Sequence, residues 1–134
     1  MSLNHKMAEK HEADLAESLG GRRTRGSGNQ FNNPMDGRHD RYAMPVAFAW
    51  DGKSTRSASI GVSRAMGEKA VEQAHGERPM LALRFYTTDR LDYDIDLVAV
   101  DRLDMSEMLT LIADQARIIE ELRAGAGDGV DCVS

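Results

Sequence analysis

The residues of this chain that are best suited to chemistry lie on either side of a short apolar run. Asp36 precedes the run at 46–50, and Asp51 and Lys53 follow it directly as an Asp-x-Lys triplet. Two carboxylates and a lysine that meet at the ends of paired strands can hold a divalent cation and prepare a water molecule for attack on a phosphate. The stretch therefore predicts a site for phosphodiester hydrolysis, and we interpret the rest of the chain as its scaffold.

Mg²⁺ is the cation that such a set of oxygen donors suits, with Mn²⁺ as a substitute, because Mg²⁺ prefers hard oxygen ligands. We expect Asp36 and Asp51 to be its direct ligands and the backbone carbonyl of Gly52 to be the next. Lys53 would orient the attacking water or neutralise charge on the phosphate. Asp40, eleven residues before Asp51, is a rival for the role of Asp36, which lies fifteen residues before Asp51. We prefer Asp36 because its Asp-Gly-Arg context follows the loop more naturally.

Glu12 is the fourth acidic residue of the predicted site. Residues 5–19 have the spacing of an amphipathic helix that ends at the Gly-Gly pair 20–21. The apolar face of this helix consists of Ala8, Leu15, Ala16 and Leu19, and Glu12 lies on the same face. A carboxylate there is costly unless it is paired or binds a cation. Glu12 either completes the acidic cluster from above the sheet, or lies at a boundary where it reaches solvent or pairs with an arginine.

The Asp51-Gly52 dipeptide has a second interpretation, since Asp-Gly is also the signature of a two-residue hairpin turn. A turn would explain these two residues without any chemistry. It would not explain Lys53, or the acid one strand upstream at Asp36.

Positive charge is concentrated in the loop before the site, although the net charge of the chain is −5. Residues 22–41 contain five arginines against two aspartates, whereas residues 89–131 contain twelve acids against four arginines. Arginines in a Gly-rich loop suit phosphate oxygens. The candidates for contacts with phosphate groups are Arg22, Arg23, Arg25 and Arg38. The alternative is a flexible surface loop with an ordinary mixture of solvated charges.

The remaining elements must form the scaffold. We expect strands at 46–50, 80–86 and 94–100 and a helix at 64–75 that is capped by Ser63. Residues 104–107 have the form of a capping box that opens a last helix. The order of elements predicts a mixed α/β domain at 1–123, followed by a flexible Gly-rich tail at 124–134.

The last helix has an unusually wide apolar surface. Its stripe consists of Met105, Met108, Leu109, Ile112, Ala116, Ile119 and Leu122, and is widened by Leu111 and Ile118. Such a surface suits a helix that is covered on two sides, and the second side could be another subunit. A well-buried core helix is the alternative.

Length and composition limit the class of protein. The chain has 134 residues, an apolar fraction of 41% and one cysteine, Cys132, so we expect one globular domain without an internal disulfide. There is neither a secretory h-region nor a run of about 20 apolar residues, so we expect a soluble cytoplasmic protein without a membrane partner.

Together these motifs resemble the PD-(D/E)xK nuclease superfamily, and within it the archaeal-type Holliday junction resolvases and their phage relatives. Five elements occur in the order of that family: the first-helix segment 12–22, Ser27-Gly28, Asp36, the segment 51–55, and the Arg-Pro strand 78–86. Two positions depart from the pattern. Asp51 stands where glutamate is usual, and Pro34 lies two residues before Asp36 rather than directly before it.

The resemblance implies a restriction-endonuclease-like fold, with a mixed central sheet flanked by helices. It implies a homodimer that cuts a four-way DNA junction by two symmetric hydrolyses, in the cytoplasm of a bacterium or of a phage-infected cell. Ser27 and the loop arginines would then approach the DNA. Two rival interpretations are a nuclease of the same fold that acts on duplex ends, nicks or damaged DNA, and a catalytically silent DNA-binding module.

Overall fold

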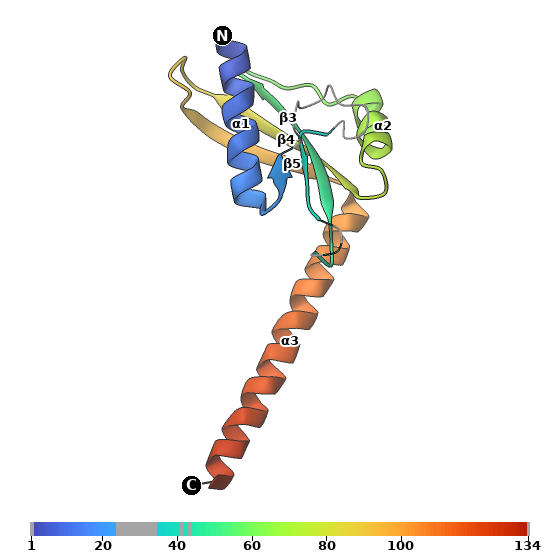
Figure 1. Ribbon diagram of the computed structural model, residues 1–134, viewed down its shortest axis with the longest axis vertical. Helices are drawn as coiled ribbons and strands as arrows, with labels where there is room; N and C mark the ends of the chain where they lie inside the picture. The colour runs from blue at the N-terminus through green and yellow to red at the C-terminus, as the bar shows by residue number, and fades with distance from the viewer. Residues whose placement is uncertain (1, 24–34, 41, 43, 134) are drawn as a thin grey trace. The chain divides into compact units, whose positions relative to one another are not determined.

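The computed structural model describes residues 2–23, 35–40, 42 and 44–133 (Figure 1). The elements in chain order are α1 (Leu3–Leu19), β1 (Arg22–Arg23), β2 (Gly37–Arg38), β3 (Phe48–Thr55), α2 (Arg64–Gln73), β4 (Arg78–Tyr86), β5 (Tyr93–Val100) and α3 (Arg102–Val133). The five strands form one sheet in the order β1-β2-β3-β4-β5. The β3–β4 pair is parallel and the other three pairs are antiparallel, which confirms the predicted mixed α/β sheet.

Helix α1 lies across one face of the sheet (Figure 1). The side chain of Ser2 accepts a hydrogen bond from the amide of His5, and Gly20 ends the helix with a left-handed φ of 71°. The buried face consists of Met7, His11 and Leu15, at a spacing of four residues. Ala8, which the sequence placed on the inner face, is exposed, because the helix is rotated so that His11 faces the sheet.

Strand β3 continues through the Asp51-Gly52 dipeptide. It pairs with β4 over its whole length, with Asp51 opposite Leu81 and Gly52 opposite Ala82. The interpretation of this dipeptide as a hairpin turn is therefore wrong, because the parallel ladder with β4 holds both residues in extended backbone.

Helix α2 forms the crossover that two parallel strands require. Its first residue and its Ser63 cap are as predicted, and the side chain of Ser63 accepts a hydrogen bond from the amide of Met66. Ala70 is the buried residue of the helix. A left-handed Gly76, with a φ of 91°, turns the chain into β4.

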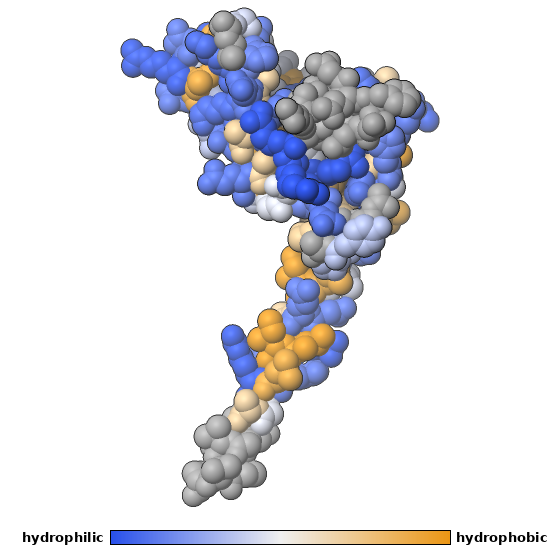
Figure 2. Space-filling view, in the orientation of Figure 1, coloured by the Kyte–Doolittle hydropathy of each residue, from blue (hydrophilic) through white to orange (hydrophobic). Residues whose placement is uncertain are grey.

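The chain divides into two compact units, residues 1–101 and 102–134. The second unit is α3, which begins at Arg102, so Asp104 lies in its first turn and not ahead of it as the predicted capping box required. The helix also includes residues 124–133, for which the sequence predicts a flexible tail. Apolar side chains gather along α3 (Figure 2).

No helix in the described part of the chain combines the length and the apolar character that crossing a membrane requires.

Candidate active site

The Asp-x-Lys triplet lies in the middle of β3, on the face of the sheet that α2 covers. Successive side chains of a strand point to opposite faces, so Asp51 and Lys53 share one face. Their side chains form an ion pair, with 3.2 Å between Lys53 Nζ and Asp51 Oδ2. Both line a pocket of about 90 Å³ between β3 and α2, which has room for a few water molecules.

Asp36 lies next to Gly52, the middle residue of the triplet. The register of β2 and β3 pairs Gly37 with Trp50, and Asp36 is the residue that directly precedes β2. The carboxylate of Asp36 is buried, and its Oδ2 accepts a hydrogen bond of 2.6 Å from the amide of Gly52. The Asp36 carboxylate is therefore held at Gly52, just beyond the end of β2, on the side of β3 that faces His11, whereas Asp51 and Lys53 face α2.

Position 52 has little room for a side chain. A Cβ at position 52 would lie 3.2 Å from Nδ1 of His11 and 3.4 Å from Oδ2 of Asp36. A strand residue presents its N–H and C=O to the same neighbour. The carbonyl of Gly52 therefore faces the same edge as the amide that Asp36 accepts from, as its predicted role as a ligand requires.

Asp40 lies beyond the other end of β2. It is exposed, and its side chain accepts a hydrogen bond from the amide of Tyr42 in a turn. His39, just before it, pairs with Phe48 at the start of β3. The geometry therefore favours Asp36 over Asp40 as the acid next to the Asp51–Lys53 segment.

Glu12 is half-buried on the flank of α1. It forms an ion pair with Arg23 of β1, with 3.1 Å between Oε2 and Nη2. This contact matches the second interpretation of Glu12, in which an arginine compensates the carboxylate.

The predicted DNA-binding residues fall into three groups. Arg22 and Arg23 are exposed on the edge strand β1. Arg38 contacts the end of α2, with 2.7 Å to Oε2 of Glu77 and 3.3 Å to the carbonyl of Gln73. Arg25 and Ser27 lie outside the described residues.

Two residues that the sequence did not suggest also line the pocket, Lys69 and Gln73 of α2. They lie three and seven residues after Met66, on the side of the helix that carries Met66 and Ala70. The helical spacing could have identified them, because positions i, i+3, i+4 and i+7 share a face.

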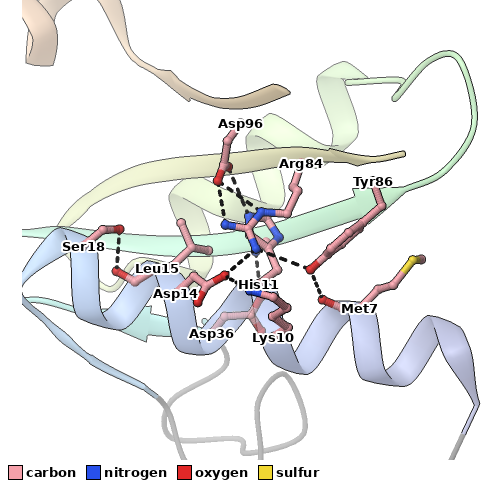
Figure 3. Close-up of polar contacts among 11 residues, drawn as sticks. Met7, Lys10, His11, Asp14, Leu15, Ser18, Asp36, Arg84, Tyr86 and Asp96 are labelled. Atoms are coloured by element: carbon pink, nitrogen blue, oxygen red, sulfur yellow. Dashed lines mark hydrogen bonds and ion pairs between the residues drawn. The ribbon is translucent and has the colours of Figure 1, made fainter. Parts of the chain in front are cut away.

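A second polar cluster lies under α1 on the opposite face of the sheet (Figure 3). At its centre is Arg84 of β4, which is 2% exposed. The guanidinium donates at 2.7 Å to Asp14 Oδ2 and at 2.7 Å to Asp96 Oδ2, and lies 3.7 Å from the ring centroid of Tyr93. Burial disfavours the charged guanidinium, but hydrogen bonds to Tyr86, Asp14 and Asp96 outweigh it and raise the pKa of Arg84.

His11 lies between this cluster and Gly52. Burial and the nearby Arg84 charge lower the pKa of His11 to about 4, despite the opposing effect of Asp96. Its Nε2 is 3.7 Å from Asp96 Oδ1 and has no hydrogen-bond partner among the described residues. The imidazole is therefore neutral at pH 7 and packs against the strand that carries the site.

The donor set fits Mg²⁺ on its chemistry. The described residues contain no group of three or more His, Cys, Asp or Glu side chains arranged to hold a metal ion. Mg²⁺ does not require one, because it is usually bound by one or two carboxylates together with water and the phosphates of a substrate. Asp36 and Asp51 would supply these two carboxylates from opposite faces of β3, with the Gly52 carbonyl at the edge of the strand.

Comparisons of the chain with protein-family models, with curated proteins and with solved structures give no match.

Proposed function

We propose that the protein is a metal-dependent endonuclease of the restriction-endonuclease-like, PD-(D/E)xK class, and that its substrate is a four-way DNA junction. The observation that carries the proposal is the meeting of Asp36 with the Asp51-Gly52-Lys53 segment in mid-strand. A turn no longer explains the triplet, and the hydrogen bond from Gly52 to Asp36 supports a joint role for Asp36 and the segment 51–53.

Each residue of the site has a distinct task. Asp36 and Asp51 would hold Mg²⁺, with the Gly52 carbonyl beside them, and the ion would neutralise charge on the phosphate and activate the attacking water. Lys53 lies within ion-pair distance of Asp51. Its ammonium would orient that water or contact a non-bridging phosphate oxygen. The hydrogen bond from Gly52 fixes the orientation of the Asp36 carboxylate before any ligand arrives.

Binding of a DNA backbone is supported by the cations near the site. Arg22 and Arg23 lie exposed on β1, at one end of the sheet, and Lys53 and Lys69 line the pocket. Phosphate contacts of this kind position a nucleic acid without reading its sequence. Recognition would therefore depend on the shape of the junction.

A homodimer would supply the two symmetric cuts. In its own unit, α3 exposes a large share of Leu109, Ile112 and Leu122, at 58%, 61% and 68%. Met105, Met108, Ile112, Ile119 and Leu122 follow steps of three, four, seven and three residues, which is the seam of a paired helix. A second copy of the chain carries the same seam, so a two-fold contact between two α3 helices is self-complementary.

The test is cleavage of three substrates, a four-way junction, a flap and a linear duplex, by the full chain with Mg²⁺ or Mn²⁺. We expect paired, symmetric cuts in the junction and none in the linear duplex. Equal cutting of the duplex would replace the resolvase by a general nuclease of the same class. Binding without any cutting would leave a silent DNA-binding module, in which the Asp51–Lys53 pair is structural.

A further inference from the structure

The pocket beside the Asp-x-Lys triplet is also lined by side chains of other residues. Asp51 and Lys53 form one wall, on β3, and Lys69 and Gln73 form the facing wall, on α2. Met66 and Leu81 contribute apolar surface. A ligand bound by Asp51 and Lys53 would therefore also contact the α2 side chains Lys69 and Gln73.

The charge of the pocket suits an anion. Lys53 is paired with Asp51, which leaves the ammonium of Lys69 as the uncompensated charge of the lining. Among the described residues Lys69 has no ion pair, whereas Arg64 and Glu68 on the same helix pair with each other at 2.9 Å. A lysine next to a carboxylate-lysine pair matches a phosphate group, whose oxygens accept hydrogen bonds from ammonium and amide donors.

The position of α2 is fixed by contacts that do not involve the pocket. Arg38 of β2 donates to Glu77 just beyond the helix and to the carbonyl of Gln73 in its last turn. Ala70, one residue after Lys69, is buried against the sheet. The side chains of Lys69 and Gln73 are thus held over β3 by the rest of the helix, and Arg38 acts as a positioning residue for α2.

We propose that Lys69, with the amide of Gln73 beside it, binds a phosphate of the substrate in this pocket, next to Asp51 and Lys53. The inference rests on the proposed function for the identity of the substrate, a DNA phosphodiester. The binding of a phosphate group itself follows from the lining of the pocket. Lys69 would contact the substrate, and Arg38 would hold the end of α2 in position through Glu77 and the Gln73 carbonyl.

The experiment compares Lys69→Ala with Lys6→Ala, an exposed lysine of α1 that does not line the pocket. Junction binding is measured over a salt series in an Asp51→Asn background, so that cutting does not interfere. We expect Lys69→Ala to bind about tenfold more weakly and to reduce the salt slope by about one, because one phosphate contact is lost. Lys6→Ala should match its parent. Equal affinities and slopes for the two variants would overturn the inference while leaving the nuclease proposal intact.

A second measurement does not depend on DNA. Inorganic phosphate is titrated into the full chain, and the backbone amide resonances of Lys53, Lys69 and Gln73 are followed by NMR. Saturable shifts that disappear in Lys69→Ala, with an unchanged melting temperature, support the phosphate site even if the protein cuts no DNA. The absence of such shifts in the unmodified chain would overturn it.

Discussion

The Oδ2 atom of Asp36 accepts a hydrogen bond of 2.6 Å from the backbone amide of Gly52. Among the described residues β2 pairs with β3 only as far as Trp50, and this contact lies just beyond that end of the pairing. A partly buried amide at the end of such a ladder needs an acceptor, and the carboxylate supplies it. The same contact holds the Asp36 carboxylate at the middle residue of the Asp51–Lys53 segment.

The first prediction separates the two candidate acids that precede β3. Asp36→Asn removes a charge beside the Asp51–Lys53 segment, and we expect it to reduce the junction cleavage rate by more than about 100-fold, since a metal ligand supports several kcal/mol of transition-state stabilisation. Asp40→Asn changes an exposed turn residue and should keep nearly full activity. Single-turnover cleavage with Mg²⁺ measures both. The reverse ranking would move the metal ligand to Asp40.

The second prediction concerns the space around Gly52. In Gly52→Ala the new methyl group meets His11 and Asp36 at 3.2 and 3.4 Å, so one of them must move. We expect a loss of about 1–3 kcal/mol in the free energy of unfolding, as is usual for overpacking. Gly61→Ala is the matched control, because a Cβ at position 61 has no neighbour within 4 Å among the described residues. Urea denaturation compares them, and an equal effect of both substitutions would contradict the close approach.

How far the sequence predicts this fold depends on whether the relevant forces are local. The Ser63 cap and the Gly20 stop are signals within one helix turn, and both are found where the sequence places them. The Asp-Gly signal at 51–52 is equally local but is overridden, because β4 pairs with both residues in parallel. Parallel pairing joins residues about 30 positions apart here, beyond the reach of a turn motif.

The polar cluster around Arg84 also depends on contacts between residues that are far apart in the sequence. The sequence shows an arginine inside an apolar strand, but its two carboxylate partners are Asp14, 70 residues away, and Asp96, 12 residues away. Only the packing of α1 over β4 and β5 brings these residues together. The contact of Asp36 with Gly52 needed less, because Asp36 directly precedes β2, the antiparallel neighbour of β3.

The third prediction concerns the stability of the protein in mild acid. The pKa of His11 is about 4 in the folded chain, against 6.5 for an ordinary histidine, mainly because of burial and then because of Arg84. Between these values the unfolded chain binds a proton at His11 that the folded chain does not. The free energy of unfolding therefore falls as the pH is lowered from 6.5 to 4, with a slope that approaches about 1.4 kcal/mol per pH unit.

The measurement for His11 is a comparison of slopes. Urea denaturation between pH 4 and 7 gives the slope for the natural chain and for His11→Gln, which cannot titrate. The lowered pKa of Asp14 affects stability only near and below its ordinary value of 3.8, so it does not obscure this window. Identical slopes for His11→Gln and the natural chain would show that His11 titrates normally.

The last prediction tests the pairing of two α3 helices. Ile112 lies in the proposed seam, 61% exposed, whereas Ala113 lies one residue, or about 100°, further round the helix. Ile112→Asp places a charge in the seam of both copies and removes apolar surface worth about 1.5–3 kcal/mol per side chain. We expect the dimer dissociation constant, from sedimentation velocity, to rise by at least about 100-fold. Ala113→Asp adds the same charge outside the seam and should leave the dimer intact. This interface would be excluded if the natural chain sediments as a monomer, or if the two variants have the same dissociation constant. Two symmetric cuts would then require a different dimer contact.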